Sequence, residues 1–197
     1  MVQWYHLIIT AYGFWLPNDP RGSWSDLVGS WELYKFGPAT TVTGKRSYAH
    51  DPHDVALRRA AKRALKYPVV RFDDAQRGAI AKGFAQAIAE SGYLVHACCI
   101  GHDHAHLVTT RHERTIEQVA KHLKSRATMA LTGAGLHPLK AHRTRQNTVP
   151  TPWAEGIWSV FINEVEQLRA AIGYVERHPR KEGLALQHYD FVGALIV

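Results

Sequence analysis

Hydrophobic positions along this chain follow two periods, one typical of strands and one typical of helices. Four segments dense in aromatic and β-branched residues predict strands, which cover residues 4–12, 93–100, 106–110 and 156–162. A four-residue turn, Gly101 to His104, lies between the second and third strands, so these two are predicted to form a hairpin. The apolar end of the chain, residues 189–197, is expected to add an edge strand or to dock on a partner.

Longer segments place apolar residues three and four positions apart, the spacing of one helix face. The first predicted helix covers residues 73–92. The second covers residues 115–133 and opens with a capping box of Thr115 and Gln118. A basic and polar stripe runs along this second helix beside its apolar stripe.

The last predicted helix opens at Asn163, with Glu166 three residues on as its capping partner. Its apolar stripe consists of Val165, Leu168, Ile172 and Val175. Pro179 is expected to end it, because proline has no backbone N–H to donate. A shorter basic helix is predicted over residues 54–67, and most of its charges are expected to be a solvated face.

The order of these elements predicts an α+β fold. The strands and long helices follow the β-α-β-β-α-β order of a ferredoxin-like antiparallel sheet with helices on one face, and an extra C-terminal helix comes last. A length of 197 residues suits a single domain, residues 1–197. The stretch 30–70, whose first part, residues 30–50, has no clear period, is predicted to be an insertion.

Charge changes this picture by suggesting a partner. Lys and Arg exceed Asp and Glu by 24 to 17, a net charge of +7, which makes nucleic acid the first candidate partner; the alternative is a merely basic surface.

The adjacent Cys98 and Cys99 lie in an apolar run, which predicts buried, reduced thiols and a cytoplasmic location. The sequence shows neither a leader peptide nor an apolar stretch of about 18 residues, so no membrane partner is expected.

Residues 101–108 read GHDHAHLV and hold the first candidate chemistry. Residues two apart on a strand point to the same face, so His104 and His106 are expected to project together while Ala105 turns into the core. Two adjacent imidazoles can hold one divalent metal ion. The alternative is a pair of surface histidines on a hairpin.

The last helix supplies candidate partners for this histidine pair. Tyr174 and His178 are four residues apart and share a helix face to one side of the apolar stripe. A tyrosine hydroxyl beside a bound metal can attack phosphorus and form a covalent intermediate. Because a free phenol has a pKa near 10, it needs a cation or a base nearby. The alternative is that Tyr174 is an ordinary residue of an amphipathic helix.

Several motifs together resemble one family. GHDHAHLV is similar to the histidine–hydrophobic–histidine signature of HUH endonucleases, and WSVF at 158–161 and YVERHP at 174–179 follow in the family's order. The segment YHLIITAYGFWLPNDPRGSW, residues 5–24, is similar to the start of a subset of its members. The closest resemblance is to the one-tyrosine transposases of the IS200-like superfamily, including REP-associated tyrosine transposases.

This resemblance implies a ferredoxin-like fold, a Mg²⁺ or Mn²⁺ site, and cleavage of single-stranded DNA near hairpins. The implied products are a 5′-phosphotyrosine and a free 3′-hydroxyl, which can be rejoined. His104 and His106 would be metal ligands and Tyr174 the nucleophile. His178 stands where typical members carry Gln or Asn as a further ligand, which suggests a shift toward Mn²⁺. Asp103 and His102 replace the family's common Asn and Pro.

Binding of DNA requires cations for the phosphates and can use aromatic rings for the bases. The candidate contacts are Lys121, Lys124 and Arg126 on the second long helix, Arg143 and Arg145 in the loop after it, and Arg21, Trp15 and Trp24 after the first strand. The alternative for the tryptophans is that they fill the core or pin their own loop.

The sequence therefore favours a metal-dependent, tyrosine-using nuclease and strand transferase for single-stranded DNA with a hairpin. One alternative is a protein that binds DNA hairpins without cutting them. Another is a hydrolase that uses water on a metal held by His104, His106 and His178. A homodimer is possible on this pattern, with the tyrosine serving its own chain's metal or a partner's.

Overall fold

A computed structural model of the chain describes residues 3–43 and 48–193. The elements are β1 (Trp4–Thr10), α1 (Trp31–Tyr34), α2 (Val55–Arg63), α3 (Asp74–Ser91), β2 (Val95–Ile100), β3 (His104–Thr110), α4 (Ile116–Gly133), β4 (Trp158–Ile162) and α5 (Val165–Lys181). In this part of the chain, no helix is both long enough and apolar enough to cross a membrane.

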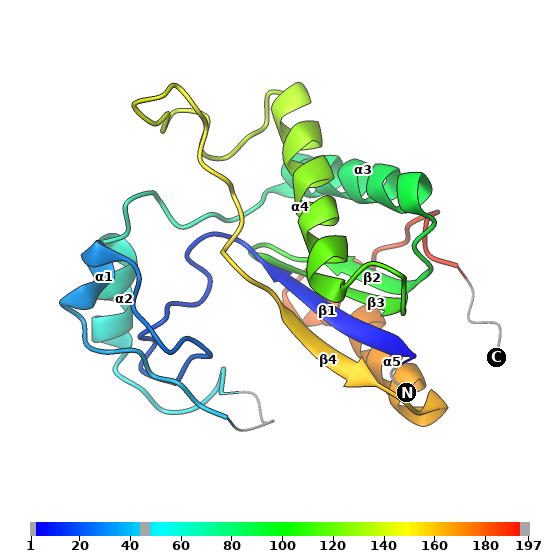
Figure 1. Cartoon of the computed structure of the whole chain (residues 1–197), viewed down its shortest axis with the longest axis horizontal. Coiled ribbons are helices and arrows are strands. Elements are labelled where there is room, and N and C mark those ends of the chain that lie inside the picture. The colour runs from blue at the N-terminus through cyan, green and yellow to red at the C-terminus, as the bar shows by residue number, and fades with distance from the viewer. Residues whose placement is uncertain (1–2, 44–47, 194–197) are drawn as a thin grey trace.

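The four strands form one antiparallel sheet in the order β2-β3-β1-β4 (Figure 1). The β2–β3 hairpin lies beside β1, and β4 pairs with the other edge of β1. This is the strand order of a ferredoxin-like sheet, which confirms the predicted α+β fold. The first and third strands lie in the centre, so side chains on them are flanked on both sides.

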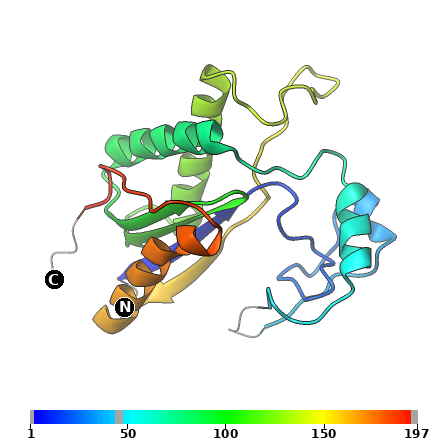
Figure 2. The ribbon, with the colours of Figure 1, turned by 180° about the vertical axis from the view of Figure 1, so that it is seen from behind.

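Helices cover both faces of the sheet (Figures 1 and 2). Helices α3 and α4 pack on one face, where Leu7 and Ile9 are fully buried, and α5 packs on the other through Leu168 and Val175. The neighbours Cys98 and Cys99 belong to these two opposite cores, because successive strand residues alternate between faces. Both thiols are buried and free, as predicted.

Three predicted boundaries are wrong. Strand β3 begins at His104, inside the predicted turn, because pairing with Thr10 of β1 extends the ladder to that residue. Helix α5 takes Glu164 as its N-cap without a side-chain cap bond, so the predicted Asn163 capping box does not form. The helix also continues through Pro179 to Lys181, because proline sits in the last turn, where the loss of one N–H interrupts only one bond of the ladder.

The stretch 30–70 contains α1 and α2, which lie to one side of the sheet (Figure 1). These helices share a small apolar cluster with the loop after β1, formed by Leu16, Val28, Leu33 and Ala61. The cluster is separate from both cores of the sheet, as an insertion requires. The division of the chain into one domain with an insertion remains a prediction.

The chain after α5 returns to the sheet. Val192 forms a parallel bridge with Val95 of β2, and the N–H of Gly193 donates to the Val95 carbonyl at 2.9 Å. Up to Gly193, the predicted apolar tail therefore lies along the free edge of β2. The rest of that predicted segment, 194–197, lies outside the described residues.

Helices α3 and α4 cross closely at a glycine. A Cβ built on Gly83 of α3 would lie 2.5 Å from the Cα of Ala127 on α4, closer than packed atoms can approach. Gly83→Ala should therefore lower the free energy of unfolding by about 1–3 kcal/mol, the usual cost of overpacking. Gly78, on the exposed side of the same helix, has open space around it, so Gly78→Ala should raise the free energy by about 0.5–1 kcal/mol. Urea unfolding measures both, and equal effects of the two substitutions would contradict this packing.

Candidate metal and nucleophile site

Three histidines converge between the sheet and α5. His104 and His106 project from β3 toward α5, and His178 projects back from that helix. Each offers one ring nitrogen, and these nitrogens all lie within 4.8 Å of one another. All three side chains are buried, and the Nε2 atoms of His104 and His178 are 2.8 Å apart. Ala105 is fully buried on the opposite face, as the alternation of the strand predicts.

Hydrogen bonds to the other ring nitrogens orient two of these imidazoles. Nδ1 of His104 lies 3.0 Å from Oδ1 of Asp103, which can only accept, so this nitrogen carries the proton. Nδ1 of His106 lies 2.9 Å from Nε2 of His6 on β1. A metal-binding histidine is commonly held in this way, with its second nitrogen bonded to a neighbouring acceptor.

The donor set fits a divalent cation. Nε2 of His106 and Nδ1 of His178 are buried, and neither has a hydrogen-bond partner within the described part of the chain. Burial first, and then the nearby His104 and His178, hold the pKa of His106 well below its usual range. The ring is therefore neutral at neutral pH and keeps a lone pair for a metal. These residues could hold a metal ion, as the spacing of the sequence suggested.

Two members of the cluster were not predicted from the sequence. His6 faces α5 from β1, and burial, assisted by His178, lowers its pKa to about 4, so it is neutral at neutral pH. The alternation of WYHLII already places His6 on the face opposite Leu7, which is the signal that could have found it. Glu182 is four residues after His178, one further turn along the face that carries Tyr174.

Glu182 connects α5 to the β2–β3 turn. Its Oε1 lies 3.4 Å from Nδ1 of His104 and 3.8 Å from Nε2 of His178, and its Oε2 accepts from the N–H of His102 at 3.1 Å. A Cβ on Gly101 would collide with this carboxylate, so glycine at 101 is what allows the close approach. Burial alone would raise the pKa of Glu182, but the hydrogen bond with His178 and the charges nearby lower it to about 2.

This pKa predicts how stability depends on pH. A carboxylate whose pKa is lowered by folding contributes stability above its ordinary value of 4.5, and the contribution disappears as the pH falls toward 2. Glu182→Gln should therefore unfold at lower urea than wild type at pH 7, and the gap should shrink between pH 4.5 and pH 2. Glu176→Gln, which changes an exposed carboxylate on the same helix, is the control and should have little effect. A gap that stays constant over this pH range would contradict the account.

Tyr174 lies at the solvent side of the cluster. Its side chain is 36% exposed, and its ring centroid is 5.6 Å from that of His106 and 5.3 Å from that of His178. The Lys181 ammonium lies 4.6 Å from the centre of the phenol ring. Burial, followed by the nearby Cys99 and Glu182, raises the pKa of Tyr174, so the phenol is protonated at neutral pH. A cation or a base must therefore help this hydroxyl to act as a nucleophile.

The structure places the predicted DNA contacts on α4 and the loop after it in two groups. Lys121, Arg143 and Arg145 are exposed, although Arg143 bonds within its loop to Asn147. Lys124 and Arg126 are already engaged by the protein. Lys124 donates to the carbonyls of Ala154 and Gly156, and Arg126 pairs with Glu90 of α3 at 2.8 Å. A contact from these two to DNA remains a prediction.

The predicted contacts after β1 also have partners in the protein. Arg21 pairs with the fully buried Asp19 at 2.7 Å, and its guanidinium lies 3.9 Å from the ring centre of Trp15. The Trp15 indole donates to the carbonyl of Gly22. Trp24 is half exposed and packs edge-on against Trp158 of β4. The structure thus gives Arg21 and Trp15 a role in holding their own loop, and a role in DNA binding remains a prediction.

Comparison with known proteins gives a similarity in fold. No protein-family model and no curated protein matches the sequence. Among solved structures, the chain is similar to a REP-associated tyrosine transposase bound to a REP hairpin, at 13% identity and a TM-score of 0.45. The match covers 61% of this chain and 65% of the transposase chain, which is less than two thirds of either. A similarity of this size assigns no activity to this chain.

Proposed function

We propose that this protein is a metal-dependent endonuclease and strand transferase that acts on single-stranded DNA near hairpins. The observation that carries the proposal is the position of Tyr174, whose ring lies beside three histidines that could hold one metal ion. The type of reaction, strand cleavage and rejoining through a phosphotyrosine, is proposed from the resemblance of the motifs at 101–108 and 174–179 to one-tyrosine transposases. The basic surface suits a DNA substrate.

A divalent cation held by His104, His106 and His178 would polarise the scissile phosphate and neutralise the charge that develops on it. The Tyr174 oxygen attacks phosphorus, and a bond from Tyr174 to phosphorus forms as the bond to the 3′ oxygen breaks. The phenol loses its proton, and the departing oxygen gains one to become a 3′-hydroxyl. The reverse reaction with another 3′-hydroxyl rejoins the strand.

The nucleophile acts on the site of its own chain in this proposal. Tyr174 and His178 lie on the same face of α5, and that helix packs directly on β3, which carries His104 and His106. One chain therefore supplies the tyrosine and all three candidate ligands. A homodimer is compatible with this arrangement, but the chemistry does not need a residue from a partner.

An imidazole at 178, in place of an amide, bears on the choice of metal. Imidazole is a softer ligand than an amide oxygen and suits Mn²⁺ better than Mg²⁺. We therefore expect the protein to use either ion, with Mn²⁺ effective at the lower concentration.

Among the candidate DNA contacts, Lys121 and Arg145 are exposed and have no bonded partner in the described residues.

A covalent-adduct assay tests the proposal. Single-stranded hairpin oligonucleotides, labelled on the 3′ side of the expected break, are incubated with the protein and Mg²⁺ or Mn²⁺ and run on denaturing protein gels. The proposal predicts a labelled protein band that needs the metal. Cleavage that yields a free 5′-phosphate and no labelled protein would favour a hydrolase that uses water. Binding without cleavage across a pool of hairpins would favour a DNA-binding protein.

A further inference from the structure

The insertion displays an aromatic pair that packs on nothing in the protein core. Trp31 and Tyr34 of α1 are 86% and 66% exposed, and their rings lie parallel within 8°, with centroids 6.1 Å apart. Between them in the sequence, Leu33 points the other way and is buried against Ala61 of α2. The helix is therefore anchored by Leu33, and the two rings face solvent on its outer side.

Positive charge is concentrated in the same part of the chain. Residues 30–70 hold eight Lys and Arg against three Asp and Glu, which is +5 of the net +7 of the chain. Exposed cations on and just after α2 include Arg59, Arg63 and Lys66, and none of them forms an ion pair with another described residue. Unpaired cations of this kind are available to bind phosphates.

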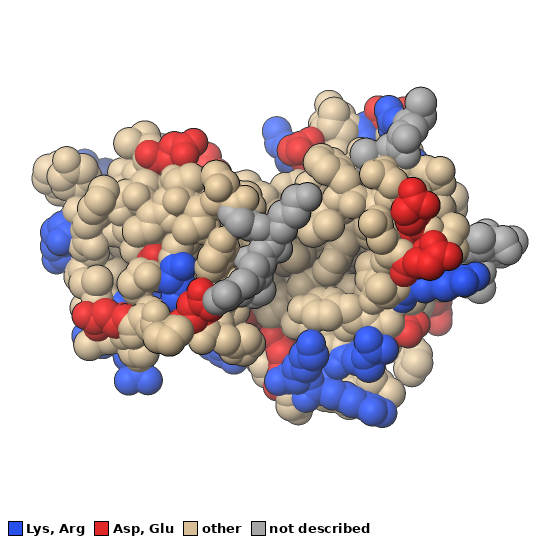
Figure 3. All heavy atoms as spheres, turned by 90° about the horizontal axis from the view of Figure 1, so that it is seen from below, with Lys and Arg blue, Asp and Glu red and all other residues tan. Residues whose placement is uncertain are grey.

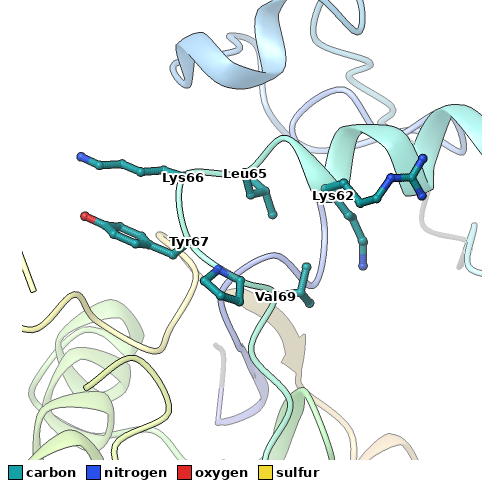
Figure 4. A pocket seen from close by; sticks show the side chains of 7 residues that line it. Lys62, Leu65, Lys66, Tyr67 and Val69 are labelled. Atoms are coloured by element: carbon teal, nitrogen blue, oxygen red, sulfur yellow. The ribbon is translucent and has the colours of Figure 1, made fainter. Parts of the chain in front are cut away.

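The two helices that carry the basic and aromatic groups pack against each other. Leu33 of α1 and Ala61 of α2 belong to one apolar cluster, and Leu65, just after α2, packs against it. A pocket of 420 Å³ opens at that end of α2, and Lys62, Lys66 and Tyr67 line it (Figure 4). The insertion thus carries exposed rings on α1, and exposed cations and a hollow at the end of α2.

The insertion is also connected to the histidine site. The Lys62 ammonium donates to the carbonyl of Phe14 at 3.0 Å, and the Phe14 ring centroid is 5.1 Å from that of His104. The loop after β1 therefore contacts both α2 of the insertion and the histidine site. Figure 3 shows Lys and Arg side chains on both halves of this face of the molecule.

We propose that the outer surface of α1 and α2 binds single-stranded DNA, with bases stacked on Trp31 and Tyr34 and phosphates bound by Arg59, Arg63 and Lys66. Bases of a duplex are already stacked on each other, so exposed rings select unpaired nucleotides. The proposal rests on the proposed function for the identity of the nucleic acid. It adds a second binding surface, which would hold the unpaired DNA that flanks a hairpin.

The test is a binding titration without metal, so that cleavage plays no part. Fluorescence anisotropy with a labelled oligothymidylate compares wild type, Trp31→Ala and Tyr34→Ala. Stacking contributes enough per base that each substitution should weaken binding by about 10-fold. An oligonucleotide with the same phosphates but abasic sugars should bind wild type and both variants equally. Arg59→Gln with Arg63→Gln should weaken binding to both oligonucleotides and reduce the salt dependence, because it removes phosphate contacts.

Two controls keep the result specific. Leu27→Ala removes an exposed apolar side chain from the neighbouring loop without removing a ring, and Lys82→Gln removes an exposed charge from α3. Both should leave the affinity unchanged. Circular dichroism first checks that Trp31→Ala and Tyr34→Ala are folded. If the folded variants bind the oligothymidylate as tightly as wild type does, the proposal is wrong. Equal weakening by Leu27→Ala would also overturn it and would identify an apolar surface for a protein partner.

The outcomes also separate this proposal from the proposed function. If stacking is confirmed and no covalent adduct forms on any hairpin, the protein binds DNA and does not cut it. If an adduct forms and the ring substitutions leave affinity for single strands unchanged, the nuclease proposal stands and the insertion has no part in binding.

Discussion

Tyr174→Phe should abolish the covalent protein–DNA band and reduce cleavage by about 1,000-fold or more, the scale seen when an enzyme loses its nucleophile. The substitution removes one oxygen from a ring that is 36% exposed, so the fold and the neighbouring histidines should not change. Cleavage rate and adduct yield on a labelled hairpin measure the effect.

Tyr5→Phe is the matched control for this prediction. Tyr5 lies on β1 and packs on the opposite face of the sheet, against the core beneath α3 and α4. Its hydroxyl is therefore separated from the histidine cluster by the sheet, and its loss should leave cleavage unchanged. Cleavage at the wild-type rate by Tyr174→Phe would contradict the assignment and favour attack by water.

The second large effect concerns metal affinity. His106→Ala should weaken Mn²⁺ binding by more than about 100-fold, because even substitution of an outer partner of a ligand costs about 10–100-fold. His6→Asn, which changes such an outer partner, should have the smaller effect. Binding is measured on the protein without DNA, by the loss of the free Mn²⁺ signal in electron paramagnetic resonance.

The control for the metal site is His96→Gln. His96 lies on β2 and bonds to the hydroxyl of Thr110, outside the cluster, so Mn²⁺ affinity should not change. If His106→Ala binds Mn²⁺ as tightly as wild type, the three histidines are not the metal site. If His96→Gln weakens binding as much as His106→Ala, the titration reports a general effect on the protein.

Local patterns predicted much of the fold and part of the site. The strand period placed His104 and His106 on one face and Ala105 in the core, and the helix period placed Tyr174 beside His178. These relations depend only on residues close in sequence. The order of the elements predicted the ferredoxin-like sheet, but it left open whether α5 would lie beside β3 of its own chain.

The remaining features depend on contacts between distant segments. His6 joins the cluster only because β1 pairs with β3, which brings residues 100 positions apart to 2.9 Å. Glu182 reaches His104 because α5 continues past Pro179, which local rules predicted to end the helix. The sequence also could not show that Arg21 is already paired with Asp19, because that bond depends on how its loop folds.

Peptide mapping of the covalent adduct tests the central claim most directly. The protein is incubated with the hairpin and Mn²⁺, the DNA is trimmed with nuclease, and the protein is digested with trypsin. Cleavage after Arg169 and Arg177 releases the peptide 170–177, in which Tyr174 is the only tyrosine. The account predicts a nucleotide on Tyr174 of that peptide. A nucleotide on any other residue, or unmodified peptide together with fully cleaved DNA, would contradict it.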